Sequence, residues 1–344
     1  MENIISEIKR KESFSFEETF SIYKKCSSLI FKDKTTAQKL LINILDNLFK
    51  FDKSLHVILT NLIESIGFYP YLSKEKLALD STDSKIRQNY HYSDNINKFL
   101  HEDQKYLLSL LHTDKNIIVS APTSFGKSLL IEEIIASRKF KKIINIQPTL
   151  ALLEKKKKKL KKYDDSYKLI VKTSQTSSDD KGNIYLFTAE RVNEYQDFRH
   201  IDFIIIDEFY KLSSQRDDER ADSLNNAFHY ILKKYNSKFY LLGPNIDNIS
   251  DGFVEKYNAI FYKTKTSLVD TNIIDIYSKH QRKFQQPRKY KEYKEEVLFD
   301  LLLEKFNEQN IIYCSSPARV RYLAKKFSRF IESQIESLNE SKFE

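Results

Sequence analysis

The chain has 344 residues, 41% apolar and 31% charged, which suffices for two or more domains with sizeable cores. It lacks an apolar run of about 18 residues and a signal-peptide pattern at its N-terminus, so we expect a cytoplasmic protein without a membrane partner. Two distant cysteines, Cys26 and Cys314, argue against a disulfide framework or a thiolate metal site. The net charge of +9 suits a polyanionic partner, although a general lysine bias would give the same charge.

The N-terminal segment predicts a small all-helical domain, which we place at residues 1–90. Apolar residues recur at helical spacing in Ala37–Phe49 and Leu55–Ile63, without the alternation of strands. Gly67–Leu72 interrupts the helices, and the polar stretch Asp80–Ser84 predicts a linker.

From about residue 95, short apolar runs alternate with helical segments. Several runs are apolar on both faces, which is typical of a parallel sheet covered by helices on both sides. We therefore expect an α/β fold, a doubly wound parallel sheet, over residues 91–275. The candidate strands are Asn116–Val119, Lys142–Gln147, Lys168–Lys172, Asn183–Phe187, Phe203–Ile206 and Phe239–Leu242.

A phosphate-binding loop, Ser120-Ala-Pro-Thr-Ser-Phe-Gly-Lys-Ser128, lies between the first candidate strand and the helical pattern Leu129–Ile135. Ala121 stands where the usual first glycine would be, but its spacing to Gly126 is intact. The loop's backbone N–H groups can surround a β-phosphate at the positive end of the helix dipole. The expected nucleotide-binding residues are Thr123, Ser124, Phe125, Gly126, Lys127, which reaches the β- and γ-phosphates, and Ser128, which offers its hydroxyl to Mg²⁺.

An acidic pair, Asp207-Glu208, follows the candidate strand Phe203–Ile206, at the strand end where open α/β sheets bind ligands. We expect Asp207 to hold Mg²⁺, through water, and Glu208 to orient or deprotonate the attacking water. Together with Lys127, these acids are the expected catalytic residues of a nucleotide hydrolase.

Three further charged segments are interpreted from their surroundings. The run Lys155–Lys159 predicts a largely solvated helix face, because helical rotation spreads consecutive lysines around the axis. Asp217–Arg220 predicts a helix start. The basic, aromatic stretch Tyr277–Lys294 either contacts a nucleic-acid backbone or is a solvated linker. We assign residues 276–308 to this linker and the helix Glu295–Phe306 that follows it.

Seven short segments between residues 95 and 320 fall in the order of the superfamily 2 helicase motifs. They are His101–Gln104, Ala121–Ser128, Pro148–Leu152, Thr188–Arg191, Asp207–Tyr210, Leu242–Asn245 and Tyr313–Pro317. The chain therefore resembles DEAD/DEAH-type helicases of superfamily 2, most closely the helicase subunits of bacterial antiphage systems of the Hachiman type. The resemblance implies that the sheet is RecA-like and that a second RecA-like lobe begins in residues 309–344, with a first strand in Asn310–Pro317.

The resemblance also implies residue roles. Gln104 occupies the position that reads the adenine edge, which favours ATP. The positions that grip the backbone of one nucleic-acid strand are Pro148, Thr149, Thr188 and Arg191. The positions that couple nucleotide state to that grip are Tyr210, Gly243 and Asn245. Tyr210 replaces the usual His or Asp, and Gly-Pro-Asn replaces the common Ser-Ala-Thr, so the coupling contacts differ from those of many members.

We therefore expect an ATP- and Mg²⁺-dependent DNA helicase or translocase, with DNA favoured over RNA. It is expected to be the sensor subunit of an antiphage complex that controls a partner nuclease. Because no arginine-bearing motif of the second lobe is present, we expect the chain to be the N-terminal part of a longer helicase. Two alternatives stay open: a nucleotide-dependent scaffold that holds an effector with little hydrolysis, and a P-loop kinase acting on a small molecule.

Overall fold

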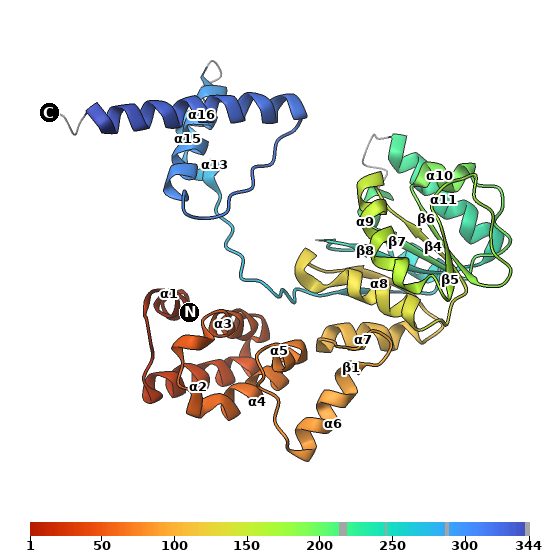
Figure 1. The fold of residues 1–344 in the computed structure, drawn as a ribbon, viewed down its shortest axis with the longest axis horizontal. Helices are drawn as coiled ribbons and strands as arrows, with labels where there is room; N and C mark the ends of the chain where they lie inside the picture. The colour runs from red at the N-terminus through yellow and green to blue at the C-terminus, as the bar shows by residue number, and fades with distance from the viewer. Residues whose placement is uncertain (213–218, 245, 286–288, 341–344) are drawn as a thin grey trace. The chain divides into compact units, whose positions relative to one another are not determined.

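The computed structural model describes residues 1–212, 219–244, 246–285 and 289–340. The chain forms two compact units, Met1–Asp270 and Thr271–Glu344. Figure 1 traces the chain through both units. No helix in the described ranges is both long and apolar enough to cross a membrane.

The first part of the larger unit is helical, as predicted. Tyr23, Leu40 and Ile63 are fully buried at the centre of its core. A capping box between Ser15 and Glu18 begins the second helix. The helices are α1 (Glu2–Arg10), α2 (Phe16–Lys32), α3 (Lys34–Asp46), α4 (His56–Ile66), α5 (Tyr69–Lys74) and α6 (Thr82–His91), with 3₁₀ turns at Leu48–Lys50 and Lys53–Leu55.

The expected linker at Asp80–Ser84 is wrong, because α6 begins at Thr82. The Ser81 side chain accepts a hydrogen bond from the backbone N–H of Ser84 at 3.4 Å and caps the helix. Small polar residues are common both in linkers and at helix starts, so composition alone did not distinguish the two.

The helical part is joined to the sheet through the first turn of α7 (Glu102–Leu111). The Glu102 N–H donates to the Gly67 carbonyl at 3.0 Å, and the Glu102 carboxylate pairs with Lys34 at 2.6 Å. The His101 ring lies edge-on to Phe68, with ring centroids 5.4 Å apart. A two-stranded antiparallel ladder, β1 (Tyr92–Ser93) and β2 (Lys98–Phe99), precedes α7.

The sheet has seven strands in the order β5-β6-β4-β7-β8-β3-β9, and all neighbours pair in parallel. Six of the strands confirm the predicted ones. The seventh, β9, was missed; it forms one edge of the sheet, and Ala259 is its one buried residue. The strands are β3 (Asn116–Ser120), β4 (Lys142–Ile146), β5 (Tyr167–Ile170), β6 (Gly182–Phe187), β7 (Phe203–Asp207), β8 (Lys238–Gly243) and β9 (Ala259–Lys263).

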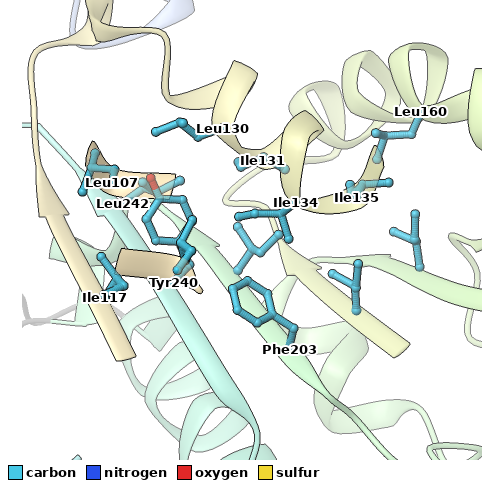
Figure 2. Close-up of a cluster of buried hydrophobic side chains, with 14 of the residues drawn as sticks. Leu107, Ile117, Leu130, Ile131, Ile134, Ile135, Leu160, Phe203, Tyr240 and Leu242 are labelled. Atoms are coloured by element: carbon cyan, nitrogen blue, oxygen red, sulfur yellow. The ribbon is translucent and has the colours of Figure 1, made fainter. Parts of the chain in front are cut away.

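Successive side chains of the central strands enter two different cores, one on each face of the sheet. In β7, Phe203 and Ile205 belong to one core, and Ile204 and Ile206 belong to the other. The first core, shown in Figure 2, includes residues of α7, α8 (Lys127–Ala136) and α9 (Leu150–Leu160). The second includes residues of α10 (Ala189–Glu194) and α11 (Glu219–Tyr235), with Phe253 of α12 (Asp251–Lys256) packed against it. This arrangement confirms the doubly wound α/β fold.

The smaller unit contains helices only, within its described residues. They are α13 (Ile276–Lys279), α14 (Gln281–Phe284), α15 (Tyr290–Glu304) and α16 (Pro317–Glu340). Phe299 and Leu302 pack against Leu323, and the buried Glu295 carboxylate pairs with Arg319 at 2.6 Å. The strand predicted in Asn310–Pro317 is wrong: Ile311 is 99% exposed and has no β partner among the described residues. That a second lobe begins here stays a prediction.

Candidate nucleotide-binding site

The predicted phosphate-binding loop connects β3 to α8 through a 3₁₀ turn, Thr123–Phe125. Phe125 is 1% exposed and anchors the loop in the core. Gly126 has φ +84°, in the left-handed region that favours glycine. A Cβ at this position would lie 2.5 Å from Nε2 of Gln104, so the loop requires glycine for both conformation and space.

Lys127 lies folded over the loop. Its Nζ donates to the carbonyls of Ala121 and Pro122, both at 2.8 Å. Burial lowers the pKa of the Lys127 ammonium, while the charges of Asp207 and Glu208 oppose that shift. Phosphate contact therefore requires Lys127 to exchange two carbonyl acceptors for phosphate oxygens.

The acidic pair lies at the same edge of the sheet as the loop. Asp207, the last residue of β7, is in register with Leu242 of β8, and the following Gly243 is in register with Ser120 of β3. The carboxyl ends of these adjacent strands thus place the acids beside the loop. Glu208 has φ +61°, a strained value for a residue with a side chain, and turns the chain into a 3₁₀ segment, Phe209–Leu212.

Both acids have lysine partners. Lys156 of α9 places Nζ 3.6 Å from Oδ2 of Asp207, and Lys211 places Nζ 2.6 Å from Oε2 of Glu208. Neither lysine was predicted to lie at the site. For Lys156 the expectation of a solvated run is wrong, since its side chain is only 13% exposed. The available signal was helical spacing, because Leu153 and Leu160 place Lys156 on their buried face.

Gln104 connects α7 to the phosphate-binding loop and is 1% exposed. Its side-chain oxygen accepts the His101 N–H at 3.0 Å, and its Nε2 donates to the Phe125 carbonyl at 2.7 Å. Reading a base therefore requires Gln104 to exchange one of these bonds. An open pocket of about 590 Å³ borders Gln104 and Gly126; it is lined also by Pro70, Ser73, Lys74, Tyr92, Asn97, Lys98, Phe99, His101, Leu129 and Leu268.

Two of the four predicted strand-gripping residues lie close to the acidic pair. Pro148, just after β4, and Thr188, the residue before α10, line a cavity of about 80 Å³ together with Asp207 and Lys211. Thr149 is exposed and caps α9, accepting the Leu152 N–H at 3.4 Å.

Arg191, the fourth predicted strand-gripping residue, is partly buried and bonded to the protein backbone. Its guanidinium donates to the Val171 carbonyl at 2.7 Å. A contact from Arg191 to a nucleic-acid backbone would therefore use its remaining donors.

Of the three residues predicted to couple nucleotide state to strand grip, the structure describes Tyr210 and Gly243. Gly243 ends β8, and a Cβ there would lie 2.7 Å from Ile246 and 3.3 Å from the Phe209 ring, so this turn packs closely on the segment after the acidic pair. Tyr210 is half-buried in that segment. Asn245 and the predicted helix start at Asp217 lie outside the described residues.

The site can supply two oxygen ligands for Mg²⁺: the hydroxyl of Ser128, exposed in the first turn of α8, and the carboxylate of Asp207. The described residues contain no group of three or more His, Cys, Asp or Glu side chains that could hold a metal by themselves. Mg²⁺ prefers a few protein oxygens combined with nucleotide phosphates, and this donor set fits that preference.

Comparison with known families matches two parts of the chain. Residues 1–85 match the Anti-bacteriophage protein B N-terminal domain, and residues 101–242 match the DEAD/DEAH box helicase family. The chain therefore carries a DEAD/DEAH-type helicase domain preceded by that N-terminal domain, and the resemblance to superfamily 2 helicases is confirmed. The RecA-like assignment of the sheet is confirmed with it.

Among individual proteins, the chain is similar to Anti-bacteriophage protein B of Escherichia coli (strain K12). The two are 32% identical over 244 residues, which cover 68% of this chain and 33% of that protein. The matched part is thus about a third of the relative's length. The crystal structure of the DUF1998 helicase MrfA aligns with 78% of this chain and 41% of its own, with a TM-score of 0.44 and 14% identity.

Proposed function

We propose that this chain is the ATP-binding part of an ATP-dependent DNA helicase or translocase. The observation that carries the proposal is the arrangement at one sheet edge: the phosphate-binding loop after β3 and the acids after β7 lie within the segment that matches DEAD/DEAH helicases. Such a pair of elements is the minimum for nucleotide hydrolysis. DNA is proposed over RNA, and the cytoplasm is the proposed location.

In this proposal the loop from Thr123 to Ser128 holds the phosphates through backbone N–H groups and Lys127. Glu208 orients the attacking water and accepts its proton. When bound, Mg²⁺ would supply positive charge that neutralises the phosphates. Ser128 would hold this ion through its hydroxyl and Asp207 would hold it through water, and Gln104 contacts the base from α7.

Strand contact is assigned to the loops that follow β4 and β6. Thr149 offers a backbone N–H and a hydroxyl, Thr188 offers a second hydroxyl, and Pro148 offers an apolar contact. Because Pro148 and Thr188 share a cavity with Asp207 and Lys211, a strand held by these two residues lies close to Asp207. This proximity supports coupling between strand binding and hydrolysis.

A role in phage defence is proposed from the two matches that carry the Anti-bacteriophage protein B name. In this proposal the protein is the DNA-sensing subunit of a complex, and a nuclease is its effector partner. Residues 1–90, 91–275, 276–308 and 309–344 are retained as the proposed helical domain, first lobe, linker and second-lobe start.

One observation favours the alternative of a nucleotide-dependent scaffold with little hydrolysis. Lys211 pairs with Glu208 at 2.6 Å, so the carboxylate oxygen that would accept the proton of water already accepts a hydrogen bond from an ammonium. If this pairing persists in the nucleotide complex, the protein binds ATP without turning it over. The small-molecule kinase alternative has no comparable support, because a kinase does not need the loops at Pro148 and Thr188.

The test is the ATPase rate of the full-length gene product alone and with single-stranded DNA, duplex DNA or RNA. Lys127→Ala and Glu208→Gln are measured alongside. We expect stimulation by DNA at least tenfold above the basal rate and loss of that stimulated rate in both variants.

The outcomes separate the proposals. No stimulation by any nucleic acid contradicts the translocase. ATP binding without measurable hydrolysis, with or without DNA, favours the scaffold. Stimulation that survives Lys127→Ala contradicts the assignment of the site.

A further inference from the structure

Lys156 lies on the buried face of α9. Leu153 and Leu160 on the same face are 1% and 4% exposed and pack in the core on one face of the sheet. The side chain of Lys156 is 13% exposed, whereas that of the next residue, Lys157, is 44% exposed and pairs with Glu154. A lysine thus stands where the period of the helix calls for an apolar residue.

The Lys156 ammonium has an opposite charge nearby but no hydrogen bond. Its Nζ is buried without a hydrogen-bond partner among the described residues, and it lies 3.6 Å from Oδ2 of Asp207. That distance exceeds a normal hydrogen bond, so the two groups are held as adjacent charges. A buried ammonium is strongly destabilising unless an opposite charge compensates it, and Asp207 provides that charge.

Asp207 is also the carboxylate assigned above to Mg²⁺, so two cations depend on one acid. A Mg²⁺ ion held by Asp207, whether directly or through water, would place a double positive charge a few ångströms from the Lys156 ammonium and repel it. We propose that Lys156 is the counter-ion of Asp207 in the metal-free protein and that it competes with Mg²⁺ for this carboxylate. The inference rests on the proposed function for the assignment of the metal to Asp207.

The same contact connects the metal to a proposed strand-binding loop. Thr149 caps the N-terminus of α9, and Lys156 lies two turns further along the same helix. A metal that displaces the Lys156 ammonium therefore acts on the helix that directly follows Pro148 and Thr149. Lys156 is thus a positioning residue between the nucleotide state and the strand grip.

The competition is tested by equilibrium binding of a fluorescent ADP analogue at increasing Mg²⁺ concentrations. Lys156→Met removes the charge and keeps most of the side-chain volume, and Lys157→Met is the matched control on the exposed face. We expect the half-saturating Mg²⁺ concentration to fall at least threefold in Lys156→Met and to stay unchanged in Lys157→Met. An unchanged or higher value in Lys156→Met overturns the competition.

This experiment also distinguishes failure of the inference from failure of the proposed site. Nucleotide binding by the wild type that does not depend on Mg²⁺ contradicts the metal assignment and, with it, the inference. Mg²⁺-dependent binding that is the same in the wild type and Lys156→Met contradicts the inference alone. Lys156→Gln, an uncharged polar side chain, replaces Lys156→Met in both measurements if the methionine variant does not fold.

A double-mutant cycle tests the ion pair without metal or nucleotide. Asp207→Asn leaves the buried ammonium of Lys156 uncompensated, so the melting temperature of the ligand-free protein should fall. In a Lys156→Met background the same substitution should lower the melting temperature by less than half as much. Equal shifts in the two backgrounds overturn the pairing.

Discussion

At Gly126 the backbone conformation and the neighbouring side chain both exclude a Cβ atom. The φ of +84° costs a substituted residue about 1–2 kcal/mol. The new methyl group would also lie 2.5 Å from Nε2 of Gln104 and push it from the Phe125 carbonyl. We predict that Gly126→Ala lowers nucleotide affinity at least tenfold and lowers the free energy of unfolding, measured by fluorescent-nucleotide titration and urea unfolding.

Gly252 provides the control for that substitution. It lies in α12, and a Cβ there would have as its nearest neighbour Ser250 Oγ at 3.8 Å. Gly252→Ala should leave nucleotide affinity unchanged and stabilise the protein by about 0.5–1 kcal/mol. Equal effects of the two substitutions on nucleotide binding would contradict the role of Gly126.

Tyr240 has a buried hydroxyl without a partner among the described residues, in the core shown in Figure 2. Burial raises the pKa of this phenol. Leaving a buried polar group unpaired costs about 1–3 kcal/mol, so Tyr240→Phe should leave the free energy of unfolding unchanged or raise it. Tyr185→Phe, which loses a 2.8 Å bond to Ser177, should lower it by about 1 kcal/mol. Urea unfolding checks both; destabilisation by Tyr240→Phe would reveal a partner for its hydroxyl.

At this scale the sequence predicted the residues that a local pattern defines. Gly126 and Lys127 lie at the expected start of their helix, and Asp207 lies at the expected end of its strand. The apolar and helical patterns beside each motif indicated where the strand ends and the helix begins. The partners of the acids were not predictable in the same way. Lys156 belongs to a run of five lysines, and the composition of the run hides the helical spacing from Leu153 and Leu160 that places Lys156 on the buried face of α9.

At the scale of elements, the contact between α7 and the helical part depends on a neutral histidine. His101 is buried against Phe68 and Tyr71, and burial lowers its pKa to about 4. The unfolded chain therefore binds a proton below about pH 6.5 that the folded chain binds only near pH 4. This histidine therefore leaves the free energy of unfolding unchanged above pH 6.5 and lowers it as the pH falls towards 4.

We predict that protonation of this histidine in the unfolded chain lowers the free energy of unfolding by about 1 kcal/mol when the pH falls from 7.5 to 5.5. In His101→Phe, which keeps an aromatic ring without the titration, the decrease over this pH range should be smaller by that amount. Urea unfolding at the two pH values measures it. The same decrease in both proteins would place the pH dependence elsewhere.

Strands were predicted best where both of their faces are buried, because a short run that is apolar on both faces indicates a central strand of a covered sheet. β7 and β8 are apolar along most of their length, and both lie in the middle of the sheet. β9 was missed because an edge strand buries less of its surface. The linker expected at Asp80–Ser84 was wrong because Ser81, a capping residue, has the composition of a loop.

At the scale of the whole molecule, the order of motifs predicted the helicase-type first lobe, and the match over residues 101–242 supports it. The N-terminal helical part was predicted without a motif, because its apolar residues recur at helical spacing, and these residues form its core. The strand predicted in Asn310–Pro317 came from an apolar run alone, and a strand also needs a neighbour to pair with. In the described part of this unit, the run is exposed instead.

The central claim is that the loop at Lys127 and the acids Asp207 and Glu208 form one hydrolytic site. The most direct measurement is the DNA-stimulated ATP turnover of Glu208→Gln compared with its ATP affinity. We predict that turnover falls at least a hundredfold while the affinity for ATP stays within about threefold of the wild type, because only the group that activates water is removed. Turnover at the wild-type rate would contradict the account.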